Sequence, residues 1–459
     1  MLDSALKQAK KIADGIVDAG SVEVVTHIDA DGIAAGAIAM RCMERAGVDG
    51  NIRYVKQLDE MAIEELRDSE RLIWFTDLGS GMLSSLDGLD YVITDHHTPA
   101  GHDASWRHFN PYRYGVSGER MVSGAGLTFL VALAMDERNS DMADLAMVGA
   151  AGDVQDAAAC RHTGWNSAIA DMGEKAGVVS RYSDLRAFGR QTRPLYKLLQ
   201  YADDPMLPGL TGRAGACRAF LQNLDIPVKE GRRWKKWMEL EPAEKRHIIS
   251  SLVSLLISRG FGHHRAGRLV GEVYELSRET EGTQLRDARE YATLLNATAR
   301  YGHADVGLQV CLGDRDEGLR AAYDLLQQHR RCIAHGIRYV KREGLREYGG
   351  LHYFNGGSTI RDTVVGIIAG MLLHSSSIKN SGPLVGFAMK NGSEVKASAR
   401  VASSMTDRGI DLASAMQHAA RQLGGIGGGH PVAAGATIPR GEEESFLALL
   451  DREVQNQLA

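Results

Sequence analysis

The chain has 459 residues, more than one ordinary core accommodates, and this length predicts two or three domains with sizeable apolar interiors. Hydrophobic residues make up 44% and charged residues 24%, as in an ordinary globular protein, which argues against disorder. The formal net charge of -5 argues against a protein that coats nucleic acid through bulk charge, although a local basic groove is compatible with it.

Cysteine usage and hydropathy indicate the setting of the protein. Five cysteines stand far apart, without a C-x-x-C pair, and an odd number is unlike a disulfide framework. We therefore expect a reducing, cytoplasmic location. No apolar run has the length of a signal or membrane segment, so we expect no membrane association, and residues 2–17 have the spacing of an amphipathic helix.

Strands and helices are expected to alternate through the first 160 residues. The expected strands span residues 22–26, 52–55, 72–76 and 91–94, and the expected helices span 32–45 and 60–68. Such alternation predicts a parallel sheet covered by helices on both faces. In sheets of this kind the functional groups gather at the carboxyl ends of the strands.

The remaining chain divides by its character. An N-terminal domain is predicted at 1–163, a mostly helical middle region at 164–301 and a C-terminal domain at 302–459. The last segment has an apolar helix at 363–373 and a hairpin turn signal at Asn391-Gly392. The predicted fold class is α/β, with an N-terminal parallel-sheet domain, a helical middle region and a smaller C-terminal α/β domain.

Four short acidic or histidine motifs lie in order in the first domain. They contain His27, Asp29 and Asp31, then Asp77, then Asp95, His96 and His97, and last Asp153. The first three motifs directly follow expected strands, and a single aspartate in such a place is more often a turn residue or a helix cap. Packing gives no reason to put three aspartates and a histidine pair at the tips of three successive strands. A mixture of oxygen and imidazole ligands suits Mn²⁺ or another borderline metal.

The order H-x-D-x-D-G, D-x-G, D-H-H and G-D resembles the four motifs of the DHH phosphoesterase superfamily. Near the C-terminus, the run Gly427, Gly428, Gly429 and His430 resembles the G-G-G-H signature of the domain that follows DHH, and Ser398-Ala399-Arg400 resembles its S-x-R segment. These segments bracket nearly the whole chain, while the middle region matches no motif. Within the superfamily the chain looks most like archaeal RecJ-like single-strand exonucleases, the GINS-associated nuclease type.

The resemblance implies two divalent metal ions, with Mn²⁺ favoured over Mg²⁺. It implies that His27, Asp29 and Asp77 hold one ion, and that Asp31, Asp77, His96 and Asp153 hold the other, with Asp77 as the bridge. RecJ proteins commonly have aspartate at the position of His27, whereas we associate histidine there with the archaeal RecJ-like branch.

Two residues of the third motif are expected to act in catalysis. Asp95 either orients a neighbouring histidine through its second ring nitrogen or only caps the loop, and both alternatives stay open. His97 is expected to face the substrate phosphate or the leaving oxygen.

The glycine-rich segment 424–430 allows backbone N–H groups to approach an anion closely, although such a run alone is more often a flexible loop. With Arg400 and the upstream motifs, a phosphate-binding function is favoured, in which Arg400 binds bidentately and Ser398 donates one hydrogen bond. The predicted phosphate-binding residues are Ser398, Arg400, Gly427, Gly428, Gly429 and His430. A nucleic-acid end would be held between the two α/β domains.

The predicted function is a Mn²⁺-dependent exonuclease on single-stranded DNA or RNA, in repair or replication. Two basic runs, 229–237 with Trp234 and Trp237 and 330–346, could follow a strand, although each is more often a solvated helix face. One alternative is a nanoRNase or a cyclic-dinucleotide phosphodiesterase, which usually lacks the long middle region. Another is a replisome scaffold that binds GINS. Polarity, the choice of DNA or RNA and the oligomeric state stay open.

Overall fold

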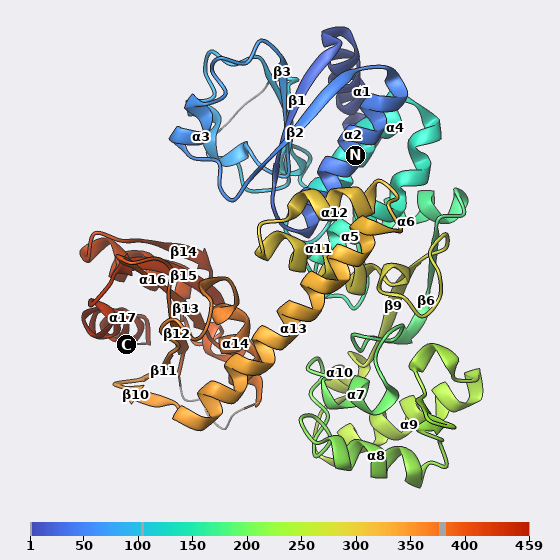
Figure 1. The fold of residues 1–459 in the computed structure, drawn as a ribbon, viewed down its shortest axis with the longest axis vertical. Coiled ribbons are helices and arrows are strands. Elements are labelled where there is room, and N and C mark those ends of the chain that lie inside the picture. The colour runs from blue at the N-terminus through green and yellow to red at the C-terminus, as the bar shows by residue number, and fades with distance from the viewer. Residues whose placement is uncertain (1, 102–104, 376–381, 459) are drawn as a thin grey trace. The chain divides into compact units, whose positions relative to one another are not determined.

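The computed structural model describes residues 2–101, 105–375 and 382–458, and the chain divides into two compact units, Met1–Leu326 and Gln327–Ala459 (Figure 1). Each unit combines helices with a sheet of its own. The predicted α/β class, with a parallel N-terminal sheet, a helical middle and a C-terminal α/β part, is confirmed. Within the described ranges, none of the helices has the length and apolar character needed to cross a membrane.

The sheet of the first unit is parallel throughout, with the strand order β2-β1-β3-β4-β5. Its strands are β1 (Ser21–His27), β2 (Asp49–Val55), β3 (Leu72–Thr76), β4 (Tyr91–Thr94) and β5 (His108–Phe109). The predicted limits of β3 and β4 agree with the structure. The two residues of β5 were not predicted, because so short a strand has no visible periodicity.

Helices cover both faces of this sheet. The larger core contains α1 (Leu2–Ala19), α2 (Ala30–Ala46), α4 (Gly124–Met135) and α5 (Ala143–Gly152). Helix α2 is buried on nearly all sides because both α4 and α5 pack against it. The opposite face has a smaller core with the short helix α3 (Glu60–Glu64) and the 3₁₀ segment η1 (Ser80–Ser85). The helix expected at 60–68 is therefore shorter than predicted.

The middle of the chain has its own apolar core. This core is formed by α7 (Leu195–Gln200), α8 (Ala214–Asn223), α9 (Pro242–Ser258) and α10 (His263–Gly267). Two antiparallel strands, β6 (Val179–Leu185) and β9 (Val270–Leu276), lead into it and out of it. The chain then returns to the first core through α11 (Ala288–Arg300), which packs against α5 and α2, and through α12 (Ala304–Cys311).

The other elements of the first unit are short. They are η2 (Pro111–Tyr114), η3 (Glu137–Met142), α6 (Trp165–Lys175), the pair β7 (Lys229–Glu230) and β8 (Arg233–Trp234), η4 (Trp237–Glu239) and η5 (Gln284–Arg286). The long helix α13 (Glu317–Glu343) crosses the division between the two units.

The second unit contains a six-stranded mixed sheet in the order β10-β11-β12-β13-β15-β14. The strands are β10 (Arg346–Tyr348), β11 (Leu351–Asn355), β12 (Leu384–Met389), β13 (Glu394–Arg400), β14 (Ile426–His430) and β15 (Ala433–Pro439). The hairpin predicted at Asn391-Gly392 is confirmed by the antiparallel pair β12 and β13. The Asn391 side chain accepts hydrogen bonds from the backbone N–H groups of Ser393 and Glu394.

Helices pack on both faces of this second sheet. Helix α14 (Asp362–Ser375), predicted at 363–373, packs on β12 and β13 from one side. Helices α16 (Leu412–Gln422) and α17 (Glu443–Leu458) form a core with the side chains of the other face, such as Val395, Ala397 and Ala399. The short helix α15 (Ser403–Thr406) follows β13.

Candidate metal centre and phosphate face

The first three motifs meet at one edge of the parallel sheet. Thr26, Thr76 and Thr94 are register partners on β1, β3 and β4, so they occupy the same rung of three neighbouring strands. Each motif follows its threonine directly, at the carboxyl end of the strand. The fourth motif arrives from a helix, because Asp153 is the C-cap residue of α5.

Ligand-type atoms surround Asp77. Nδ1 of His27 lies 2.9 Å from Oδ2 of Asp29 and 3.8 Å from Oδ2 of Asp77. On the other side, Nε2 of His96 lies 3.2 Å from Oδ1 of Asp77 and 3.3 Å from Oδ2 of Asp153. Nε2 of His96 also lies 3.8 Å from Oδ2 of Asp31, so the structure brings together all the residues that the sequence predicted as metal ligands.

Three groups of side chains could each hold one ion, with ligand atoms within 4.8 Å of one another. The groups are His27, Asp29 and Asp77; Asp31, His96 and Asp153; and Asp77, His96 and His97. Asp77 belongs to two of them, as a bridging ligand would.

The surroundings of Asp77 are unfavourable for a charged carboxylate. It is 2% exposed, and its Oδ1 accepts no hydrogen bond of good geometry, although Nε2 of His96 lies 3.2 Å away. Its backbone φ of 61° is uncommon for a residue other than glycine, and such conformations cluster at functional sites. Burial and the neighbouring Asp31 raise the pKa of Asp77 well above its ordinary value. A divalent cation would stabilise such a carboxylate, so the residues present fit a metal site.

His96 and Asp153 are also close to several negatively charged side chains. Burial raises the pKa of Asp153, and the charge of Asp31 raises it further. Burial lowers the pKa of His96, but contacts with Asp77 and Asp153 outweigh burial and leave this pKa well above its ordinary value. The cluster therefore attracts positive charge.

The tautomer of His96 follows from its second ring nitrogen. Nδ1 lies 2.7 Å from the carbonyl oxygen of Gly118, which can only accept a hydrogen bond, so Nδ1 carries the proton. In the neutral ring the lone pair is then on Nε2, the atom that faces the carboxylates, as in a histidine that binds a metal ion. The sequence had not indicated Gly118.

Asp95 performs both of the actions that the sequence left open. Its Oδ1 lies 2.7 Å from Nδ1 of His97 and accepts the backbone N–H of the same residue, while its Oδ2 accepts the N–H of Ser80. The histidine that it orients is His97, since His96 uses Gly118. Asp95 is 1% exposed, whereas the His97 ring is 58% exposed, so the buried carboxylate presents the imidazole to solvent.

Backbone groups and glycines complete the first site. The N–H groups of Gly124 and Ala125, at the start of α4, donate to the two carboxylate oxygens of Asp31 over 2.6 and 2.9 Å. A Cβ atom on Gly149 would lie 2.2 Å from Oδ1 of Asp31, so only glycine fits there. These positions were missed, because isolated glycines in helices carry no signal of the side chain that they accommodate.

Helix α11 also reaches the site. Oδ1 of Asn296 accepts the backbone N–H of Ala30 over 3.2 Å. One turn later, burial lowers the pKa of Arg300 while the charge of Asp29 opposes that effect. A polar and a cationic side chain from far along the sequence thus border the first motif.

The predicted phosphate-binding residues gather on one face of the second sheet. Ser398 and Arg400 are two residues apart on β13 and so point to the same side. A Cβ atom on Gly366 of α14 would lie 2.7 Å from Nη2 of Arg400 and 3.3 Å from Oγ of Ser398. Lys396, which the sequence prediction missed, lies on this face too. Its pKa is lowered by burial and, to a smaller extent, by the charge of the nearby Lys390. The i, i+2, i+4 spacing on β13 was the signal that could have identified it.

The glycine run is an edge strand and not a loop. Gly428 and His430 of β14 pair with Gly435 and Ala433 of β15, whose other partners are Ser398 and Arg400. Directly opposed residues share a face, so Gly428 and His430 lie on the same face as the two β13 residues. A Cβ atom on Gly427 would lie 2.5 Å from the carbonyl oxygen of Met416, which explains one glycine through close packing.

One of the two tryptophans in the first basic run is not available to bases. Trp237 is 0% exposed and its Nε1 donates to Asp184 over 2.8 Å, so the prediction that its ring stacks on nucleic acid is wrong. The ring centroid of Trp234 lies 4.6 Å from the ring centroid of Tyr196. The ammonium group of Lys229 lies 4.3 Å from the same Trp234 centroid. Glutamates also pair with Arg233 and Lys235.

Three known domains match this chain. The N-terminal domain of the DHH family matches residues 21–150, the DHH-CID domain matches 187–270 and the DHHA1 domain matches 350–456. Among curated proteins, a Methanocaldococcus jannaschii protein described as uncharacterized is 27% identical over 469 residues, which is 99% of both chains. The single-stranded-DNA-specific exonuclease RecJ of Thermus thermophilus is 28% identical over 202 residues, 40% of this chain and 28% of RecJ.

Solved structures share the fold at low identity. RecJ of Thermus thermophilus in complex with Mn²⁺ has a TM-score of 0.60 and 18% identity, over 98% of this chain and 55% of RecJ. Exonuclease RecJ bound to manganese has a TM-score of 0.59 and 19% identity, over 98% and 94% of the two chains. Cdc45 of Entamoeba histolytica has a TM-score of 0.68 and 10% identity, over 98% and 99%.

The predicted resemblance to the DHH family and its RecJ-like branch is confirmed by these matches. The chain contains an N-terminal domain of the DHH family, a DHH-CID domain and a DHHA1 domain in that order, and it has distant homology to RecJ.

Proposed function

We propose that this protein is a metal-dependent exonuclease that hydrolyses phosphodiester bonds of single-stranded DNA or RNA from an end. Its DHH-family domains and its distant relationship to RecJ support a nuclease or phosphoesterase. The observation that carries the proposal is the convergence of two ligand groups on Asp77, whose carboxylate is buried.

In this proposal His27, Asp29 and Asp77 hold one divalent cation, and Asp31, Asp77, His96 and Asp153 hold the other. Mn²⁺ is favoured by the mixture of imidazole and carboxylate ligands, and Mg²⁺ is the alternative. Structures of RecJ exist in complex with each of these metals. When bound, such a pair lowers the pKa of a water molecule and offsets the charge that develops on the phosphoryl group.

The protein's own groups orient the reacting parts. Asp95 fixes the ring of His97 through Nδ1, so that Nε2 of this exposed ring can contact a substrate phosphate or the leaving oxygen. In the second unit, Ser398, Arg400, Gly428 and His430 form an anion-binding face together with Lys396. Gly427 and Gly429 allow the edge strand to pack closely enough to build that face.

The test uses single strands of DNA and of RNA, labelled at the 5′ or the 3′ end and incubated with Mn²⁺. We expect a product ladder from one end with the native protein and none with Asp77→Ala. Asp87→Ala is the matched control, because this aspartate lies outside the three ligand groups. Cleavage of only the shortest oligonucleotides would favour the nanoRNase or cyclic-dinucleotide phosphodiesterase alternative.

A replisome scaffold that binds GINS is the second candidate, and the similarity of the fold to Cdc45 favours it. The full set of ligand-type residues at the sheet edge favours the enzyme instead. Loss of neither label in any metal, together with stable binding of the chain to purified GINS, would support the scaffold and reject the nuclease. A cytoplasmic location and a role in repair or replication belong to the same proposal.

A further inference from the structure

The loop that follows Asp153, residues 153–160, has a strained backbone. Val154 has a φ of 56° and Cys160 a φ of 57°, in the left-handed region that side chains other than glycine rarely adopt. Val154 is also β-branched, which makes this conformation less favourable still. A backbone of this kind persists only where the surrounding structure holds it in place.

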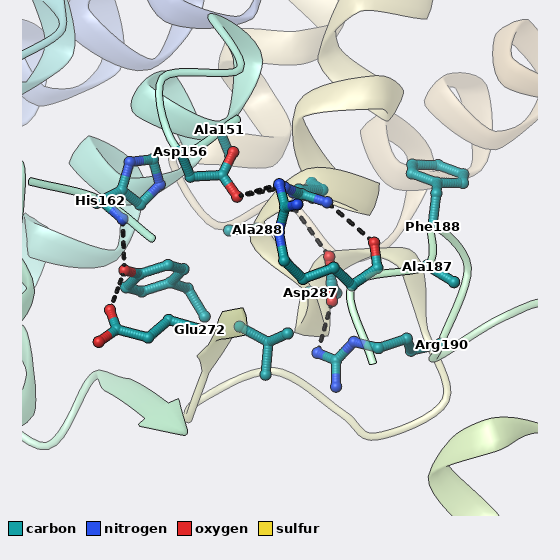
Figure 2. A pocket seen from close by; sticks show the side chains of 13 residues that line it. Ala151, Asp156, His162, Ala187, Phe188, Arg190, Glu272, Asp287 and Ala288 are labelled. Carbon is teal, nitrogen blue, oxygen red and sulfur yellow. Dashed lines mark hydrogen bonds and ion pairs between the residues drawn. The ribbon is translucent and has the colours of Figure 1, made fainter. Parts of the chain in front are cut away.

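Three arginines from outside this loop hold it, and we call Arg186, Arg268 and Arg289 the arginine clamp. Asp156, drawn in Figure 2, accepts hydrogen bonds through its Oδ2 from Nη2 of Arg186 at 3.3 Å and from Nη2 of Arg289. Nη2 of Arg268 donates to the carbonyl oxygen of Ala157 over 2.9 Å. Asp204 in turn binds Nε of Arg268 at 2.8 Å.

The end of the loop is fixed as well. Nη1 of Arg186 lies 3.2 Å from Sγ of Cys160, and the backbone N–H of Glu272 donates to the carbonyl oxygen of Cys160 over 2.9 Å. A Cβ atom on Gly271 would lie 2.3 Å from that oxygen, so the two backbones are in close contact.

The clamp is tightly packed. The side chains of Arg186 and Asp156 are each 3% exposed. They border a cavity of about 20 Å³, which is on the order of one water molecule, so these groups have little room for other arrangements. Arg190 and Asp287, which also line this cavity, form a second ion pair, with Nη2 and Oδ2 2.8 Å apart (Figure 2).

The clamp connects the middle of the chain to the metal centre. Arg268 lies within the stretch matched by the DHH-CID domain, Arg186 directly precedes that stretch, and Arg289 is on α11. All three act on the loop whose first residue, Asp153, places Oδ2 3.3 Å from Nε2 of His96.

We propose that the arginine clamp positions Asp153 as a metal ligand, so that the affinity for one of the two cations depends on side chains of the middle region. This inference rests on the proposed function, because it assumes that the cluster around Asp77 binds metal. The clamp touches no reacting atom, and its arginines are positioning residues.

The opposite end of helix α5 provides the control. Arg278 pairs there with Asp144 and Asp141, so it ties down the same helix without contacting the loop after Asp153. Arg278→Gln removes an arginine that binds two aspartates near the start of α5, whereas Arg268→Gln removes an arginine that binds Asp204 and the carbonyl oxygen of Ala157 in the loop. Only the second variant disturbs the loop.

The experiment titrates the full chain with Mn²⁺ and follows the free ion by electron paramagnetic resonance, with thermal unfolding of the metal-free chain measured in parallel. For Arg268→Gln and Arg289→Gln we expect one Mn²⁺ dissociation constant to rise by about 10- to 100-fold, the range typical of residues that orient metal ligands. Arg278→Gln should keep both constants while lowering the melting temperature by a similar amount. Saturating Mn²⁺ should restore kcat in Arg268→Gln.

Unchanged Mn²⁺ affinity in both clamp variants would overturn the clamp proposal and leave the proposed function intact. A native chain that binds two Mn²⁺ ions without cleaving any labelled strand would reject the nuclease, while the clamp is still judged by the binding constants. A native chain that binds no Mn²⁺ would overturn both.

Discussion

Gln155 and His96 donate hydrogen bonds to the same acceptor, the carbonyl oxygen of Gly118, over 2.8 and 2.7 Å. Gln155 lies two residues after Asp153, and its Oε1 accepts a hydrogen bond from Asn166. One carbonyl therefore sets both the ring orientation of His96 and the position of the loop that begins at Asp153.

Replacing Gln155 should therefore weaken metal binding without touching a ligand. In Gln155→Leu we expect an Mn²⁺ dissociation constant about 10-fold higher, since outer residues of metal sites commonly have effects of this size. Loss of the buried hydrogen bonds should also lower the free energy of unfolding by about 1–3 kcal/mol. Gln191→Leu is the matched control, because Gln191 is equally buried and hydrogen-bonded to Glu275, away from the site. Equal Mn²⁺ affinity in the two variants would contradict this prediction.

Asp77→Asn should have opposite effects on activity and on stability. Without its bridging carboxylate, the site should lose cleavage by more than about 100-fold, beyond the usual effect of a residue outside the ligand shell. In the metal-free chain the same change removes the burial of a carboxylate and its repulsion from Asp31, the two causes that raise the pKa of Asp77, so we expect a higher melting temperature than for the native chain. Calorimetry in chelator, followed by Mn²⁺ addition, measures both. A native melting temperature that exceeds that of the variant in chelator would argue against the strain.

His162 should make the fold sensitive to acid. Burial lowers its pKa from 6.5 to about 4, although Asp156 opposes the shift. Between these values the unfolded chain binds a proton that the folded chain does not, so the free energy of unfolding falls as pH falls from 6.5 towards 4. The loss from pH 7 to pH 5 should be on the order of 2 kcal/mol.

The measurement compares urea unfolding of the native chain and His162→Phe at the two pH values. The difference between the chains isolates His162, because the opposing contribution of Glu290, whose burial raises its pKa to about 7, is common to both. If both chains lost the same free energy between pH 7 and pH 5, His162 would not be the acid-sensitive group.

Lys396→Met should weaken binding of single strands. The logarithm of the binding constant should also fall less steeply with the logarithm of the salt concentration, with a slope smaller by about 0.7 for one lost phosphate contact. Binding is measured by fluorescence anisotropy in the Asp77→Ala background, which prevents cleavage. Lys390→Met is the control, since Lys390 lies on the same hairpin and pairs with Glu394. If Lys396→Met kept the slope of the chain with native Lys396, Lys396 would not contact a phosphate.

The residues of the first three motifs were predictable from the sequence, because each motif follows an apolar run whose carboxyl end defines its place in the sheet, whereas Asp153 follows helix α5. The partners that orient them were not. Arg289 contacts Asp156 from 133 positions away, and Gly118 contributes only its backbone, so neither leaves a local pattern. The wrong prediction for Trp237 has a different cause. This residue stands in a run of cationic side chains, and the spacing of such a run does not show whether an aromatic ring within it is buried or exposed.

The shared rung of Thr26, Thr76 and Thr94 determines which changes of chain length this protein can tolerate. Side chains alternate along a strand, so one residue inserted within β3 would turn Asp77 away from its neighbours and bring the preceding side chain to the tip. An equal insertion in a surface connection, such as the turn at Gly392, would leave that rung untouched. Length variation among natural or engineered versions should therefore accumulate between the strands and be nearly absent inside them.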